Sequence, residues 1–338
     1  MRHGKILIQL GAPVLLSAVA GCGGPGTSPA SGPPYSPGSP GSPPPPPPHI
    51  TMLFEQPDLS GIDGHLYAPR ATPHVGPPTG AFALVLWQAN KYQANGQLVA
   101  TAWDAGSMTG FAPTAITDAQ LGFQNLQGTS TAQAEGGTVG AYINSNDLPP
   151  STSDQKMMIT PQYIFPSGSQ PVPFAAAQTT LGGALDLQVP TAGGSNVYVV
   201  EDLLFQDGNG VRVSFGIKLF RNGGSDSTIG TGYDSPTNTY MVNSPLGNNQ
   251  LFVTSATGGA SASGSTWTGW RHFEWSVSEA QFTSALHYLA AQYPDQVKTT
   301  DPAQYVLTEV HLNAEFHTQG KPAELGWSLR GMQLWNTP

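Results

Sequence analysis

Near the carboxyl end of the chain, five polar side chains alternate with largely apolar ones. The even positions from 306 to 316 are apolar except Thr308, and the odd positions carry, in order, Glu309, His311, Asn313, Glu315 and His317. Successive side chains of a β-strand point to opposite faces, so the pattern predicts a half-buried strand with one polar face. Carboxylates and imidazoles in such a row can bind sugar hydroxyls, transfer protons or hold a metal ion.

A second expected strand, over residues 269–277, carries a comparable polar face. Trp270, His272 and Glu274 alternate there with Arg271, Phe273 and Trp275. If both polar faces line one concave surface, they bring together three carboxylates, three imidazoles, an amide and an indole ring. This shared surface is the central expectation from the sequence.

The first function that these residues predict is the binding of a neutral glycan. Aromatic faces stack on the apolar side of a pyranose ring, while carboxylates and amides accept hydrogen bonds from its hydroxyl groups. No cofactor and no bound metal are expected. The candidate ligand-binding residues are Trp270, His272, His311, Asn313, His317, Trp327 and Trp335.

Glycoside hydrolysis is the alternative, and it needs two carboxyl groups about 5 to 10 Å apart, one of them protonated. Glu309 and Glu315 are six positions apart on one strand, which is about 20 Å, so they cannot form the pair. Glu274 with Glu315, or Glu201 with Glu315, can form it if their strands are neighbours. This layout resembles concanavalin-like glycosidases, which carry their acids on facing strands of a concave sheet, although no motif of those families is matched residue for residue. No residue role is carried over from that resemblance, and if the chain is a glycosidase or lyase, Glu274 and Glu315 are the candidate catalytic residues.

Two further alternatives remain open at this point. The polar row is also typical of the solvated outer face of a structural envelope protein without catalytic activity. The second alternative is metal binding. Imidazole and carboxylate groups two residues apart on a strand can chelate zinc, and acidic groups near a hairpin can hold calcium. The residues concerned are His311, Asn313, Glu315 and His317 for zinc, and Asp202, Asp207 and Asn209 for calcium.

Composition excludes several classes of function. The formal net charge is −9, only 10% of the residues are charged, and no basic cluster occurs, which disfavours nucleic acid as a partner. The chain has no phosphate-binding glycine loop, no dinucleotide-binding fingerprint, no HExxH pair and no GxSxG motif. Nucleotide-dependent enzymes, common zinc proteases and common esterases are therefore not expected.

The amino end predicts an anchor. Arg2 and Lys5 precede an apolar run over residues 6–20, which is too short to span a bilayer as a helix, and Val19-Ala20-Gly21-Cys22 follows. This sequence resembles the lipobox of bacterial lipoproteins. The resemblance implies a signal peptide over residues 1–21 and a bilayer anchor through acylated Cys22, the only thiol. It also implies a place in the cell envelope, at the outer membrane if the host has two membranes, because Gly23 rather than Asp follows the cysteine.

The remaining chain divides into a linker and one domain. Residues 22–49 consist almost entirely of Gly, Pro, Ser, Thr and Ala, a composition that cannot bury a core. Residues 50–338 are expected to form one all-β domain, an antiparallel β-sandwich or jelly roll of about eleven strands with one short helix at about 278–293. The expected strands cover residues 81–87, 97–103, 139–143, 157–165, 197–206, 211–220, 240–242, 250–254, 269–277, 305–317 and 325–335.

Overall fold

The computed structural model describes the compact unit Pro47–Pro338 over the greater part of its length. The described residues are 50–56, 79–87, 91–92, 98–99, 111–113, 120–125, 130–135, 137–148, 152–222, 230–234, 237–245, 255–256 and 266–338. The expected leader and linker, residues 1–49, lie outside this part. So do the expected strand over residues 250–254 and the stretch 97–103 apart from Leu98–Val99.

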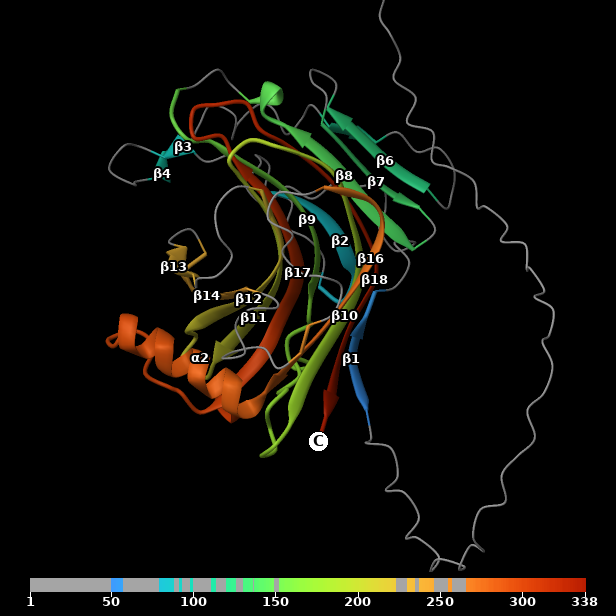
Figure 1. Cartoon of the computed structure of the whole chain (residues 1–338). Coiled ribbons are helices and arrows are strands. Elements are labelled where there is room, and N and C mark those ends of the chain that lie inside the picture. Colours follow the sequence, from blue (N-terminus) through green and yellow to red (C-terminus); the bar gives the residue numbers. More distant parts are fainter. Residues whose placement is uncertain are drawn as a thin grey trace, which may run out of the picture. The chain divides into compact units, whose positions relative to one another are not determined.

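Two β-sheets pack face to face, which confirms the predicted sandwich (Figure 1). Sheet A has the order β15 (Ser255–Ala256), β16 (Trp267–Ser278), β10 (Thr180–Gly193), β18 (Glu324–Thr337), β8 (Thr138–Asn144), β7 (Thr131–Glu135), β6 (Gln120–Asn125) and β5 (Phe111–Pro113), and β1 (Thr51–Glu55) also pairs with β18. Sheet B has the order β13 (Gly230–Asp234), β14 (Thr239–Pro245), β12 (Arg212–Asn222), β11 (Asn196–Asp207), β17 (Tyr305–His317), β9 (Lys156–Ile164) and β2 (Phe82–Trp87).

The described strands number eighteen, more than the eleven or so expected from the sequence. Two of them, β3 (Lys91–Tyr92) and β4 (Leu98–Val99), form a separate two-stranded sheet. All named strand pairs are antiparallel except β12 with β14, which are parallel. The sandwich is therefore mixed at one place in sheet B, and there the chain passes through β13 before it returns beside β12.

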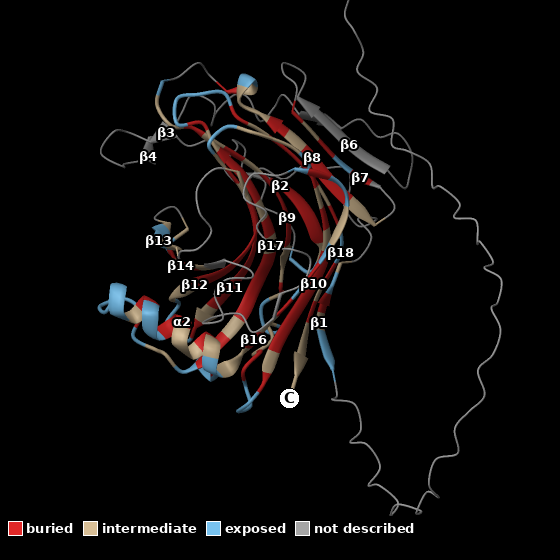
Figure 2. Cartoon of the chain, in the orientation of Figure 1, coloured by how far each residue is buried: buried red, intermediate tan, exposed pale blue. Residues whose placement is uncertain are grey.

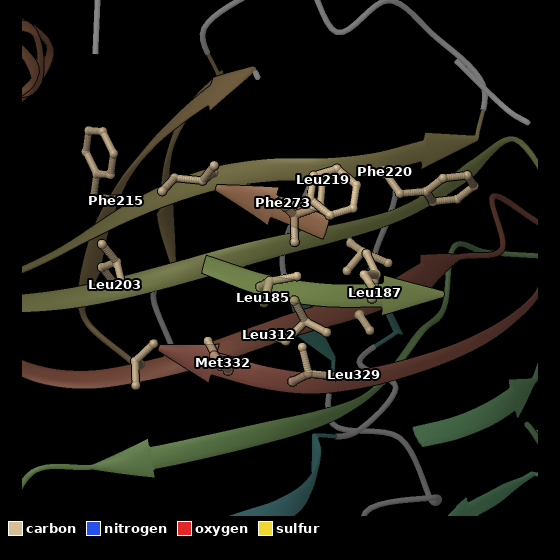
Figure 3. Close-up of a cluster of buried hydrophobic side chains, with 14 of the residues drawn as sticks. Leu185, Leu187, Leu203, Phe215, Leu219, Phe220, Phe273, Leu312, Leu329 and Met332 are labelled. Carbon is tan, nitrogen blue, oxygen red and sulfur yellow. The ribbon is translucent and has the colours of Figure 1, made fainter. Parts of the chain in front are cut away.

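The core lies between the two sheets and follows from the alternation of the strands. On β17 the side chains of Val310, Leu312, Ala314 and Phe316 are all 0% exposed, so the apolar face predicted for this strand is the buried one. Figure 3 shows Leu312 among buried side chains of both sheets. Figure 2 shows the same buried band along the central strands. Because β17 buries its even positions from 310 to 316, the polar odd positions beside them must face away from sheet A.

Strand β10 is the main element that the sequence did not predict. Its leucines alternate as in a half-buried strand, but Gly182 and Gly183 interrupt the pattern. A Cβ on Gly183 would lie 2.2 Å from the ring of Trp275, and one on Gly182 would lie 2.5 Å from the ring of Trp335. The two glycines therefore admit one indole ring on each face of the sheet, a close approach that only glycine allows.

The expected helix is present as α2 (Glu279–Gln292). Ser278 is its N-cap and forms a capping box with Gln281. The buried face consists of Phe282, Ala285, Leu286 and Leu289, at the predicted helical spacing. Short 3-10 turns, η3 (Ser145–Asp147) and η4 (Pro302–Gln304), precede β9 and β17. No helix within the described ranges is both long and apolar enough to cross a membrane.

Candidate functional site

The two polar rows predicted from the sequence lie on opposite outer faces of the sandwich. β16 belongs to sheet A and β17 to sheet B, and each turns its apolar side chains toward the other sheet. Trp275 of β16 and Leu312 of β17 are both buried in the core between them. A strand that buries one face against a second sheet must turn its other face outward. The expected shared concave surface was therefore wrong, and Glu274 and Glu315 do not form a pair.

The outer face of sheet A carries the row from β16. The guanidinium of Arg330 lies 4.2 Å from the ring centroid of Trp270, and its Nε atom is 3.0 Å from Asp186 Oδ2. The other oxygen of Asp186 lies 2.9 Å from His272 Nδ1, and these contacts lower the pKa of Asp186 against the effect of burial. The side chains of His272 and Glu274 are 58% and 51% exposed. This face is an open, solvated surface with one cation–π contact.

The two remaining tryptophans of the predicted site do not share a face. Trp327 is 2% exposed in the core, whereas Trp335 packs over Gly182 on the outer face of sheet A. Their separation of eight positions would place them on one side of a regular strand. A register shift in β18 near Gly331, which has a φ of +63°, breaks the alternation. Trp327 is thus a core residue, and the prediction that it binds ligand was wrong.

The outer face of sheet B gathers the polar row of β17 with polar residues from its neighbours. Strands β11 and β9 flank β17 on its two sides, and β12 lies beyond β11. We call this surface the sheet-B face. Its polar members include Lys156, Thr160 and Gln162 of β9, Tyr198 and Asp202 of β11, Arg212, Ser214 and Lys218 of β12, and Glu309, His311, Asn313, Glu315 and His317 of β17.

His311 lies between two carboxylates of the sheet-B face. Its Nδ1 atom is 2.7 Å from Glu309 Oε1, and its Nε2 atom is 3.4 Å from Asp202 Oδ2. Burial disfavours the charge on the ring, but hydrogen bonding to Asp202 and Glu309 outweighs that effect and raises the pKa of His311 to about 9. An imidazolium therefore joins the two carboxylates at neutral pH.

The two carboxylates are also held from their outer sides. Ser214 Oγ donates a hydrogen bond of 2.9 Å to Asp202 Oδ1, and Arg212 lies 3.6 Å from Glu309 Oε2. The contacts of 2.7 and 3.4 Å on opposite nitrogens of one ring place the two carboxylate oxygens at most about 8 Å apart, below the upper limit of about 10 Å for hydrolytic carboxylate pairs. Asp202 and Glu309 are therefore the pair that the structure brings together.

Glu315 is held in a second cluster on the same face. Its Oε1 atom lies 3.4 Å from Lys156 Nζ and 3.2 Å from His317 Nε2, and Tyr198 donates a 2.6 Å hydrogen bond to Oε2. Burial works against ionisation, but the charges of Lys156 and His317 outweigh it and lower the pKa of Glu315 to about 2. His317 in turn contacts Asp154 at 2.8 Å, and against the effect of burial these acids raise its pKa to about 9. Glu315 is thus an anion at neutral pH and has no proton to donate as a general acid.

Glu201, the other acid considered as a partner for Glu315, points to the opposite side of sheet B. It is 0% exposed in the core and accepts a 2.7 Å hydrogen bond from Trp275 Nε1. Burial without a cationic partner raises the pKa of Glu201 to about 8. It therefore cannot meet Glu315 across the sheet-B face.

The residues considered for calcium are also separated. Asp207 accepts hydrogen bonds from the backbone nitrogens of Asn209 and Val211 in the turn between β11 and β12. Asp202 lies in the middle of β11 instead, against His311. Within the described ranges, no group of three or more His, Cys, Asp or Glu side chains is placed to hold a metal ion.

Sequence reasoning considered Asp202 only as a calcium ligand and did not place it beside the polar row of β17, although a signal was present. Asp202 interrupts an apolar strand, and Gly216 of β12 lies directly beside it in the register. A Cβ on Gly216 would lie 1.9 Å from Asn243 Oδ1 and 2.8 Å from Asp202 Oδ1. An acid in the middle of a strand, opposite a glycine, thus marks a crowded polar site on one face.

No protein-family model matches the sequence, and no curated protein matches it. The chain is distantly similar to solved structures. The xyloglucanase domain of NopAA from Sinorhizobium fredii is 12% identical, with 66% of this chain and 96% of that chain covered and a TM-score of 0.33. A family 12 xyloglucanase from Bacillus licheniformis is 10% identical (61% and 92% covered, TM-score 0.29). Endoglucanase 3 of Trichoderma harzianum is 13% identical (76% and 100% covered, TM-score 0.30). Likeness of this degree transfers no site and no activity to the chain.

Proposed function

We propose that the sheet-B face binds a neutral glycan. The observation that carries the proposal is the arrangement of Asp202, His311, Glu309 and Arg212, in which two acidic and two basic groups offset one another on a face rich in hydrogen-bonding atoms. The same balance holds around Glu315, where Lys156 and His317 are offset by Glu315 and by Asp154, which contacts His317. A face whose charges are compensated internally gives no advantage to a charged ligand. Its carboxylate, amide and hydroxyl groups remain suited to sugar hydroxyls.

Hydrolysis of that glycan is the second candidate function. It is favoured by one specific observation, the position of the carboxylates of Asp202 and Glu309 on either side of His311, with their oxygens at most about 8 Å apart. The proton for the leaving oxygen would come from the imidazolium of His311, because this ring holds the proton between the two acids.

Affinity electrophoresis tests both functions. The chain carrying Cys22→Ser is run through gels that contain soluble glucans, xylans, mannans or galactans, and released reducing ends are measured in parallel. Retardation without release indicates binding, and release indicates hydrolysis. If no polysaccharide is retarded or cleaved, the proposed function fails.

A matched pair of histidine variants locates the site. His311→Gln should remove retardation, because it removes the cation that holds Asp202 and Glu309. His272→Gln, on the outer face of sheet A, should leave it unchanged. Circular dichroism establishes that both variants are folded. Loss of retardation in Trp270→Ala, with His311→Gln unaffected, would instead move the glycan to the outer face of sheet A.

We also propose that the domain is tethered to a membrane of the cell envelope through acylated Cys22, with residues 22–49 as the spacer. The support is the order of basic residues, apolar run and Val19-Ala20-Gly21-Cys22. Labelling with radioactive palmitate should mark the wild-type chain and not Cys22→Ser. Equal labelling of the two chains would contradict the anchor.

A further inference from the structure

Three polar side-chain atoms at one place on the sheet-B face have no hydrogen-bond partner among the described residues. They are Thr160 Oγ1, Gln162 Oε1 and Asn313 Oδ1, and each atom is buried. The residues Thr160 and Gln162 are themselves 0% and 3% exposed. Buried polar groups in folded proteins are almost always hydrogen-bonded, so three unpartnered atoms together require an explanation.

The strand register shows that these atoms form one cluster. His311 pairs with Gln162, and Glu315 pairs with Met158. Continuing that register places Asn313 directly opposite Thr160, and side chains opposite each other on neighbouring strands have Cβ atoms about 4.5 to 5.5 Å apart. Gln162 is the next residue of β9 on the same face. The cluster therefore adjoins His311, which contacts Asp202 and Glu309.

The other side of the cluster is apolar and small. On β2, Ala83 pairs with Gln162 and Val85 pairs with Thr160, and both are 0% exposed. The amide oxygens of Gln162 and Asn313 and the hydroxyl of Thr160 thus lie between the charged ring of His311 and the small apolar side chains of β2. A sugar ring has the matching character, since its hydroxyl groups donate and accept hydrogen bonds while its C–H groups are apolar.

We infer that Thr160, Gln162 and Asn313 form a subsite that binds neighbouring hydroxyl groups of a neutral sugar. The inference rests on the proposed function of the sheet-B face and names the residues that read the ligand. The oxygens of Gln162 and Asn313 accept hydrogen bonds from two sugar hydroxyls, and the Thr160 hydroxyl donates to or accepts from one of them. Carboxylate oxygens contribute at the His311 side of the cluster.

The test replaces a buried hydroxyl group by a methyl group. This change should lower stability if the hydroxyl is hydrogen-bonded within the protein, and should not lower it if the hydroxyl is reserved for a ligand. Thr160→Val keeps the shape of the side chain and removes a buried hydroxyl without a partner, so the melting temperature of the ligand-free protein should stay the same or rise. Thr308→Val is the matched control, because Thr308 Oγ1 is buried and donates a 3.0 Å hydrogen bond to Leu204 O. This control should lower the melting temperature and leave glycan affinity unchanged.

Affinity is measured by isothermal titration with the polysaccharide that most strongly retards the wild-type chain carrying Cys22→Ser. Thr160→Val and Gln162→Met should each weaken binding about tenfold, as expected for the loss of a hydrogen bond in a buried site. Unchanged affinity in both variants, with the wild type binding, would overturn the subsite and leave the proposed function standing. A fall in melting temperature for Thr160→Val as large as that of Thr308→Val would also overturn it, because the hydroxyl would then be structural. Absence of any binding by the wild type would instead overturn the proposed function.

Discussion

Replacing Glu201 by glutamine should remove a pH-dependent loss of stability. Glu201 is fully buried in the core and is held by Trp275 Nε1, and burial raises its pKa from 4.5 to about 8. Below pH 4.5 the carboxyl group keeps its proton in both the folded and the unfolded chain. Between pH 4.5 and 8 only the unfolded chain releases the proton, so the free energy of unfolding falls as pH rises. Above pH 8 both states are ionised and this loss is complete.

The magnitude follows from the two pKa values. The interval from 4.5 to 8 is 3.5 pH units, and at about 1.4 kcal/mol per unit it corresponds to a loss of about 5 kcal/mol. Glutamine cannot ionise, and its amide oxygen can still accept the hydrogen bond from Trp275. Its amide nitrogen adds a buried donor, whose cost of about 1–3 kcal/mol does not vary with pH. The difference in free energy of unfolding between the wild type and Glu201→Gln should therefore change by about 5 kcal/mol between pH 4.5 and 8, whatever its value at pH 4.5.

The assay is urea unfolding followed by tryptophan fluorescence at pH 4.5, 6, 7 and 8. Glu274→Gln serves as the control, since its side chain is 51% exposed on the strand that carries Trp275. The control should follow the wild-type pH profile, while Glu201→Gln should diverge from it with rising pH. Parallel profiles for all three proteins would refute the assignment of a protonated acid to the core.

Three further predictions concern stability. Gly183→Ala should unfold the domain or lower its melting temperature sharply, because a Cβ there would lie 2.2 Å from the Trp275 ring. Gly208→Ala is the control and should be tolerated, because a Cβ there would have nothing within 4 Å. Equal melting temperatures for the two variants would contradict this prediction. The pKa of His317 is raised from 6.5 to about 9, so the protonated ring stabilises the fold below pH 6.5 and this contribution is lost as the pH rises to 9. In urea unfolding, the free energy of unfolding of His317→Gln should lack this decline. Ser278→Ala should cost about 1 kcal/mol in urea unfolding through loss of the helix cap, and an unchanged midpoint would argue against the capping box.

Local patterns in the sequence were sufficient for much of the fold. The alternation of residues 305–317 predicted β17, and the apolar stretch before the Asp207–Gly210 turn predicted β11. The helix was predicted to within one residue at each end. β10 was not predicted, because its glycines look like a break in a strand when their neighbours are unknown. They are explained only by Trp275 and Trp335, which are more than 90 residues away in the sequence.

The sequence by itself determined which face of β16 and of β17 is polar, because alternation is a property of consecutive residues. It could not determine which polar faces meet, since that depends on the sheet to which each strand belongs. Only the tertiary structure placed β16 and β17 in different sheets, which separated Glu274 from Glu315 and brought Asp202 to His311. A slip in register, such as the one near Gly331, is likewise decided by pairing with neighbouring strands, and it sent Trp327 to the core and Trp335 to the outer face of sheet A.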